Sequence, residues 1–402
     1  MRLSHDAVKI HAMFDDPNLV SQAGLVPVVA LADRAGLMAL AEEHVRVPGP
    51  CGVNAAVKTG CVVAGMVAGA DSIDDLDLLR HGAMPDLFTG VRAPSTLGSF
   101  LRSFAWGNVL QLEKVSRLLL TALAGLAPLL PGRDAVAFVD IDSTQKRVYG
   151  HQKQGAAFGH AKVQGKSLLL RGLSALVATV STPLGAPVIA ATRLRGGNAA
   201  SARGAARFAA EAVGTARAAG CTGIVVVRAD SAFYSAAFTG AVRRAGAFFS
   251  VTMLMNAHVR AAIAIIAESA WTPIRYPRAV FDDQLGRWVS DAEIAEVPYT
   301  AFTSKSKGKA ITARLIVRRV RDLNHAAGPG QGNHAAPRPD QRRRPDRPAR
   351  PRPPHLAPAR SVAPRARMDE PIPGRLRPAS PHGLTSPNPV TIAPHRPRAS
   401  QP

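Results

Sequence analysis

The chain has 402 residues, of which 47% are hydrophobic and 19% charged, and its formal net charge is +22 at pH 7. This hydrophobic content is sufficient for a large core, which excludes a wholly disordered chain and favours one or two folded domains. The basic charge favours a polyanionic partner, because Lys and Arg side chains that neutralise phosphates release condensed counterions. No membrane partner is expected, since the longest weakly polar run, residues 61–70, is too short to span a bilayer.

The cysteines indicate a reducing compartment. Cys51, Cys61 and Cys221 are odd in number and lack metal-ligand spacing, so we expect reduced thiols. The first six residues contain no apolar signal core. A cytoplasmic location is therefore predicted.

Residues 14–127 are predicted to be mainly helical, with apolar side chains at helical spacing over 25–44 and 110–130. Asp71 and Ser95 are candidate N-caps of two helices between these segments. The acidic run at 71–77 lacks the glycine and the terminal glutamate of a calcium loop. The preference of acids for helix N-termini explains it better.

Two apolar, β-prone runs end in carboxylates. The first, residues 137–144, contains Asp140 and Asp142, and the second, residues 224–231, ends with Asp230. Strands of this kind can bring distant side chains to one point, where paired carboxylates hold divalent metal ions for phosphodiester chemistry. Taken singly, each aspartate is better explained as the first residue of a turn.

The elements around these runs predict the fold. Three strands, then helix, strand, helix and strand, is the order of a ribonuclease H-like α/β fold with a mixed sheet. The first and fourth strands of that fold are neighbours, so Asp142 and Asp230 are expected to meet. The predicted elements are strand 137–142, hairpin arms 167–182 and 187–194 around a Pro-Leu-Gly-Ala turn, helix 199–219, strand 224–227, helix 235–245 and strand 247–254.

Four segments are distinctive: residues 91–104, Asp-Ile-Asp-Ser-Thr at 140–144, residues 150–159, and Arg-Ala-Asp-Ser-Ala-Phe-Tyr at 228–234. Together they resemble the DDE-type insertion-sequence transposases of the group-1 DDE domain. The resemblance extends from Met13 to Asn324. It implies a ribonuclease H-like core with Asp142 as the first catalytic aspartate and Asp230 as the second, Asp140 being the alternative first ligand.

The resemblance also implies cofactors and partners. Asp142 and Asp230 would bind two Mg²⁺ or Mn²⁺ ions, one activating water or a 3′-hydroxyl and the other stabilising the leaving oxygen. The expected partners are DNA, at the element's ends and at its target, and a second copy in a homodimer.

A basic segment lies between the two acidic runs. Lys153, Lys162 and Lys166 are predicted on a loop and a strand edge where DNA phosphates would pass; ordinary surface lysines are the alternative. Residues 159–167 narrowly miss a phosphate-binding loop, because five residues separate the two glycines where the motif has four.

The family's third acid, a glutamate on a helix after a β-rich insertion, has no recognisable counterpart. Alternating residues over 272–320 predict the insertion, but no matching helix follows it. Glu268 has a suitable spacing from Asp230, on a helix predicted at 257–269. It would lie some eleven residues into that helix, roughly 16 Å from its start. We therefore expect an incomplete site.

The composition changes abruptly after residue 324. Residues 325–402 hold 19 of the 32 prolines and 14 arginines, but no Phe, Tyr, Trp, Cys or Lys. Such a segment cannot bury enough apolar surface to offset its ordering entropy, so it is predicted to be disordered. Its composition suggests the hypothesis of a frameshift near residue 325 in GC-rich DNA. With 14 arginines and four acids it carries +10 of the net +22, leaving +12 on residues 1–324.

The predicted organisation is a helical region that helps bind DNA ends or only packs (1–130), a catalytic core (131–270), a β-rich insertion (271–324) and a disordered tail (325–402). The predicted function is that of a transposase, with this copy catalytically incomplete. Two alternatives stay open. One is a non-catalytic DNA-binding relic or inhibitor of intact copies, and the other is a nucleotide hydrolase using the Lys166 region.

Overall fold

The computed structural model describes residues 18–150, 153–163, 166–274, 281–282, 287–288, 292–304, 308–320 and 390–393. Within these residues, no helix combines the length and the apolar character needed to cross a membrane. None of the three cysteines forms a disulfide.

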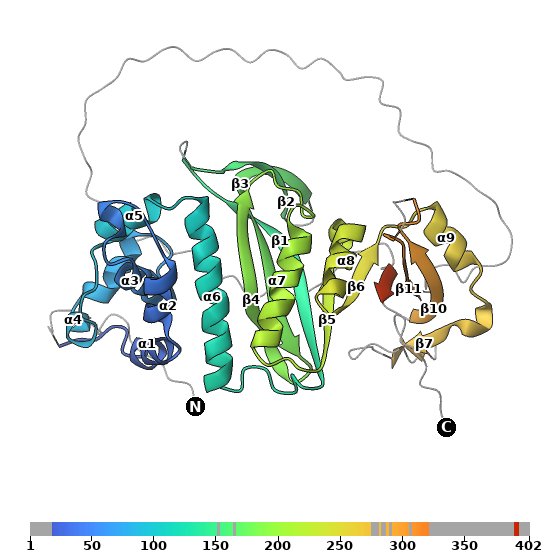
Figure 1. Ribbon diagram of the computed structural model, residues 1–402, viewed down its shortest axis with the longest axis horizontal. Helices are drawn as coiled ribbons and strands as arrows, with labels where there is room; N and C mark the ends of the chain where they lie inside the picture. The colour runs from blue at the N-terminus through green and yellow to red at the C-terminus, as the bar shows by residue number, and fades with distance from the viewer. Residues whose placement is uncertain are drawn as a thin grey trace, which may run out of the picture. The chain divides into compact units, whose positions relative to one another are not determined.

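The first described part of the chain is helical (Figure 1). The helix predicted over 25–44 is two helices, because Gly36 adopts φ 82° between them, a left-handed conformation that glycine adopts without strain. The helices are α1 (Leu25–Arg34), α2 (Leu37–His44), α3 (Ala55–Val67), α4 (Met84–Leu87), α5 (Pro94–Arg102) and α6 (Trp106–Leu126), with 3-10 turns η2 (Pro50–Gly52) and η3 (Asp74–Arg80).

Both predicted N-caps in this region are wrong. Asp71 does not cap η3; its backbone N–H and that of Ser72 donate to the Asp75 carboxylate, at 3.1 and 2.8 Å. Ser95 lies inside α5, which begins with Pro94, since proline needs no hydrogen-bond acceptor at a helix start.

The core sheet has the strand order β4-β3-β1-β5-β6. Strand β3 is antiparallel to β1 and β4, whereas β1, β5 and β6 are parallel. This mixed sheet with its helices confirms the predicted ribonuclease H-like α/β class. The elements are β1 (Val136–Arg147), β3 (Lys166–Thr182), β4 (Gly185–Gly196), α7 (Ala205–Ala218), β5 (Ile224–Ala229), η4 (Ser231–Phe233), α8 (Ala236–Arg244) and β6 (Phe248–Met253), with β2 (Ala157–Val163) pairing the first part of β3.

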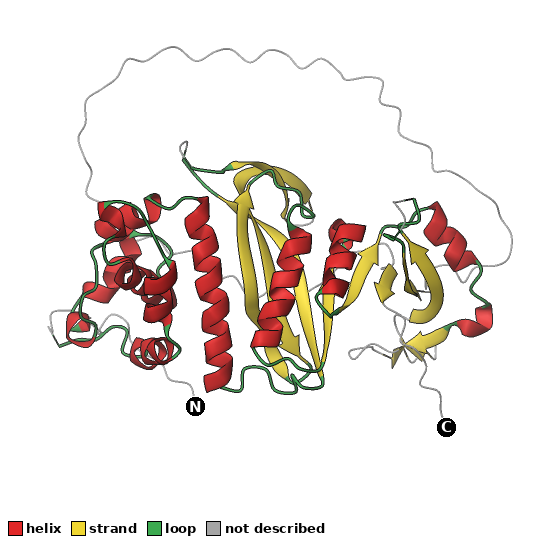
Figure 2. Ribbon diagram, viewed as in Figure 1, coloured by secondary structure: helices red, strands yellow, loops and turns green. Residues whose placement is uncertain are grey.

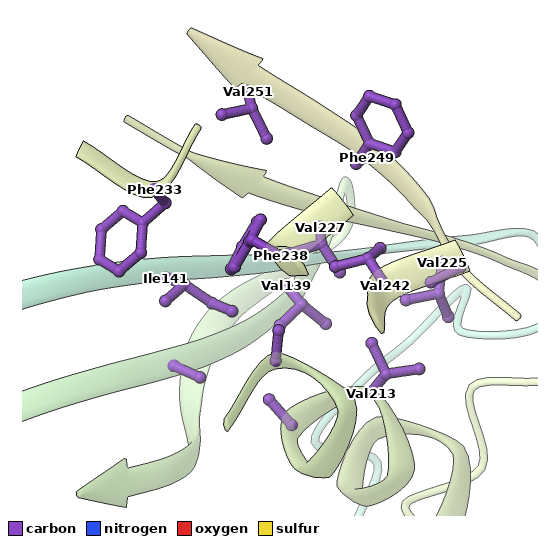
Figure 3. Close-up of a cluster of buried hydrophobic side chains, with 14 of the residues drawn as sticks. Val139, Ile141, Val213, Val225, Val227, Phe233, Phe238, Val242, Phe249 and Val251 are labelled. Carbon is purple, nitrogen blue, oxygen red and sulfur yellow. The ribbon is translucent and has the colours of Figure 1, made fainter. Parts of the chain in front are cut away.

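Helices cover one face of this sheet (Figure 2). Alternate residues of β1, among them Val139 and Ile141, point into a core that β5 and β6 continue and that α7 and α8 close (Figure 3). The side of α7 toward the sheet is largely alanine, which allows the helix to pack closely; Ala209, Ala212 and Ala216 are fully buried. The opposite face of the sheet carries Asp140, Asp142 and Arg228, together with exposed apolar side chains such as Ile224 and Phe248.

The segment after β6 is β-rich. The helix predicted over 257–269 ends early, at Ala264, where Ile263 and Ile266 turn toward the core. Sheet order continues from β6 as β12-β11-β10-β7. The elements are α9 (Ala257–Ala264), η5 (Glu268–Ala270), β7 (Thr272–Ile274), β8 (Phe281–Asp282), β9 (Arg287–Trp288), β10 (Ala292–Ala301), β11 (Ile311–Val320) and β12 (Val390–Ala393).

Strand β12 departs from the prediction of disorder over 325–402. It pairs antiparallel with both β6 and β11, for example Ile392 with Val251 and with Leu315. The β-branched run Val390-Thr391-Ile392, bounded by Pro389 and Pro394, has the strand propensity that its surroundings lack. The remainder of the tail, residues 325–389 and 394–402, lies outside the described residues.

Candidate functional site

The parallel pairing of β1 and β5 determines where the predicted acids lie. Asp140 is the Cα partner of Arg228, and Ile141 is the partner of Ala229. The next residues along the two strands are Asp142 and Asp230. Because adjacent strands are about 4.8 Å apart, this register brings the two aspartates to neighbouring positions at the same end of the sheet.

Local hydrogen bonds orient both carboxylates. Asp142 Oδ1 accepts a hydrogen bond from the backbone N–H of Ser143 at 2.7 Å. Asp230 Oδ1 accepts one from the N–H of Ala232 at 3.0 Å and thereby caps η4. Asp230 thus begins a turn, as expected for a single aspartate that follows a strand. Each of these hydrogen bonds uses one carboxylate oxygen, and both residues are exposed.

Asp140 lies in a different environment from Asp142. Its two oxygens accept hydrogen bonds from Arg228 Nε and Nη2, both at 2.6 Å. The Arg228 guanidinium lies over the ring of Phe138, 4.4 Å from its centroid. The hydrogen bonds to Asp140 raise the pKa of Arg228 above its ordinary value. Sequence inspection missed this pair, since nothing in the sequence places residues 140 and 228 opposite each other before the register is known.

Ser143 anchors the middle of β1 on the helix-covered side. Successive strand residues face opposite sides, so its side chain points away from that of Asp142. Its Oγ is 2.7 Å from Ser201 Oγ, in the loop before α7. A cavity of about 370 Å³ adjoins it, lined partly by Gln145, His160 and Asn198. The Ser143–Ser201 contact holds the aspartate-bearing part of β1 against the loop that leads into α7.

The three predicted DNA-binding lysines are only partly described. Lys153 is exposed in the segment that leads from β1 to β2. The backbones of Lys162 and Lys166 belong to the β2–β3 hairpin, where Lys166 pairs with Val163. The side chains of Lys162 and Lys166 lie outside the described residues, so the lysine prediction stays a prediction.

Glu268 is held by the insertion. It begins η5, and its carboxylate pairs with Arg319 of β11, with Oε2 at 2.9 Å from Nη1. Glu293 of β10 accepts a hydrogen bond from the same guanidinium at 2.6 Å. The Arg319 guanidinium also stacks on the ring of Trp271. Across the described residues, no three His, Cys, Asp or Glu side chains gather so that they could hold a metal ion.

Comparison with models of known protein families gives a match. The family model described as Transposase DDE domain group 1 matches residues 4–326. This range contains every described element except β12. A search of curated proteins returned no match.

Proposed function

Since this chain belongs to the group 1 family of transposase DDE domains, we propose that Asp142 and Asp230 are the cation-binding acids of a DNA strand-cleavage site. The chain would bind DNA and a divalent cation but would not cut DNA at an appreciable rate. The register of β1 against β5 supports this proposal, because it aligns the segment of β1 that carries Asp142 with the segment of β5 that leads into Asp230, while no group of three acids, histidines or cysteines in the described residues could hold a metal ion.

The residues present suit a hard divalent cation. Mg²⁺ and Mn²⁺ prefer carboxylate oxygens, which Asp142 and Asp230 offer at exposed positions. When bound, such ions supply Lewis acidity at the scissile phosphate and lower the pKa of an attacking water. The role of the chain is to orient the acids: the Ser143 N–H positions Asp142, and the η4 turn positions Asp230.

Two acids are too few for efficient chemistry. Loosely held groups lose the alignment of the reacting atoms, and displacements of about 1 Å already cost on the order of a hundredfold in rate. Glu268 does not supply the missing acid, because Arg319 holds it against the insertion. We accordingly expect DNA binding without robust cleavage.

The first test is Mn²⁺ titration of the full chain, followed by electron paramagnetic resonance. Asp142→Asn and Asp230→Asn should each weaken Mn²⁺ binding without unfolding the protein, because neither side chain is buried. Glu296→Gln is the matched control, since Glu296 is an exposed acid paired with Arg314 on β11. Unchanged Mn²⁺ affinity in both aspartate variants would refute the metal assignment.

The second test is strand cleavage of DNA carrying the element's ends, with Mg²⁺ or Mn²⁺. We expect a DNA-dependent mobility shift but no appreciable cleavage. Robust cleavage that Glu268→Gln abolishes would show that the site is complete and the proposal of incompleteness wrong. If the chain instead acts as an inhibitor, adding it to an intact family member should lower that protein's cleavage of the same DNA.

A further inference from the structure

Strands β1 and β5 place four charged side chains on one face of the sheet. Asp140 and Asp142 lie two residues apart on β1 and therefore share the face that is not covered by α7. Beside them, β5 presents Arg228 and leads into Asp230. Three acids and one base therefore share a small area, although the proposed site uses only two of the acids.

The base is committed to one of these acids. Arg228 binds both oxygens of Asp140 in a two-pronged geometry that a lysine ammonium cannot reproduce. The ring of Phe138 supports the guanidinium from beneath, at 4.4 Å. The pair remains accessible to solvent and ions, since the Arg228 and Asp140 side chains are 46% and 40% exposed.

We propose that Arg228 determines which carboxylate of β1 binds the divalent cation: it occupies and neutralises Asp140, leaving Asp142 to act with Asp230. This inference rests on the proposed function and deepens it. Arg228 is a specificity-determining residue that acts through Asp140 and does not itself contact the cation. It also explains why Asp140, although beside the site, is no substitute for the missing third acid.

The proposal predicts effects of opposite sign for the two partners. Asp140→Asn leaves the Arg228 charge uncompensated beside the cation, so Mn²⁺ should bind more weakly. Arg228→Gln releases a third carboxylate, so Mn²⁺ should bind more tightly. Asp140 and Arg228 lie two residues before Asp142 and Asp230 along their strands, about 7 Å away, and for charges at this distance at an exposed site a change of roughly three- to tenfold in Kd is expected in each direction. The double variant loses both charges and should return close to the wild-type affinity.

A purely structural ion pair would behave differently. Breaking it from either side would loosen the same β1–β5 contact, and both single variants would lose affinity. The measurement is Mn²⁺ titration of the full chain by electron paramagnetic resonance, with circular dichroism to verify folding. Arg314→Gln is the matched control, since Arg314 is a half-buried arginine whose side chain, 41% exposed, also donates to both oxygens of a glutamate across a strand pair. It should leave the Kd unchanged.

Tighter binding in Arg228→Gln together with weaker binding in Asp140→Asn supports the proposal. Effects of the same sign, or none, in these two variants overturn it even where Asp142→Asn abolishes binding, which would leave the proposed function standing. An unchanged Mn²⁺ affinity in both Asp142→Asn and Asp230→Asn would instead overturn the proposed function itself. Should Arg228→Gln fail to fold, the comparison of Asp140→Asn with the double variant decides, because the double variant must bind more tightly.

Discussion

Arg193 connects helix α6 to the core sheet, and its loss should destabilise the fold strongly. From β4, its Nη2 atom contacts Glu113 of α6 at 2.9 Å and Glu211 of α7 at 2.6 Å. The Arg193 and Glu113 side chains are only 11% and 6% exposed. In Arg193→Met, Glu113 would keep its charge in a buried position without its partner.

The cost can be estimated from this geometry. Removing one partner of a buried ion pair costs about 3–5 kcal/mol. We take the lower end, about 3 kcal/mol, because Arg207 still pairs with Glu211. At roughly 2–4 °C per kcal/mol for a domain of about this size, the Tm should fall by roughly 6–12 °C. Arg207→Met is the matched control: Arg207 binds the same Glu211 but is 82% exposed, so its loss should cost less than about 1 kcal/mol.

The loss of stability in Arg193→Met should depend on pH. Burial raises the pKa of Glu113 above its ordinary value, and Arg193 offsets this only in part. A raised folded-state pKa means that the native state binds the proton more tightly than the unfolded state, so stability is lost as pH rises through that pKa. Removing Arg193 raises the pKa further. The Arg193→Met deficit should therefore be largest at about pH 7.5 and shrink toward about pH 5.

The assay is thermal unfolding followed by circular dichroism at both pH values. The double variant Glu113→Gln/Arg193→Met should recover most of the lost Tm, because no buried charge remains. Equal Tm values for Arg193→Met and Arg207→Met, or a deficit independent of pH, would refute the reasoning.

Three further predictions follow from backbone packing and from the tail. Gly197→Ala should lower the free energy of unfolding in urea by about 2 kcal/mol or more, because a β-carbon there would lie 2.0 Å from the carbonyl oxygen of Gly172. Gly214→Ala is the control: it has open space on α7 and should raise the free energy of unfolding by about 0.5–1 kcal/mol. Ile392→Pro removes a backbone donor from β12, between β6 and β11, and should increase aggregation in light scattering; unchanged scattering would argue against a structural role for β12. Sequencing the gene and translating the other frames beyond codon 324 should reveal a glutamate-bearing helix if the frameshift hypothesis holds.

The core of the fold could be predicted because its signals are local. Apolar runs predicted β1, β5 and β6, and the Pro-Leu-Gly-Ala turn predicted the β3–β4 hairpin. Strand order alone predicted that β1 and β5 are neighbours, which the register confirms, and the meeting of Asp142 and Asp230 stays a prediction. The predicted helix over 257–269 was too long because core packing by Ile266, rather than local spacing, ends α9.

Other features depend on partners distant in sequence. The Asp140–Arg228 pair joins residues 88 positions apart and requires the register of two strands. Strand β12 was missed because composition averages over a segment, and four β-prone residues do not alter the average of a tail rich in proline and arginine. The side chains of Lys162 and Lys166 fall outside the described residues, so that part of the prediction stays open.

The place of β12 has a consequence for how the molecule is made. Synthesis proceeds from the N-terminus, so β6 and β11 emerge from the ribosome well before the strand that lies between them. Until residues 390–393 arrive, both strands present unpaired backbone edges, which are templates for pairing with other chains. The length of the chain between β11 and β12 adds little to the entropic cost of pairing the two strands, since each doubling of a loop's length costs only about 0.6 kcal/mol. The late synthesis of β12, more than the length of the loop before it, therefore makes the nascent chain prone to aggregation. A chaperone that covers the edges of β6 and β11 would act before residues 390–393 are made.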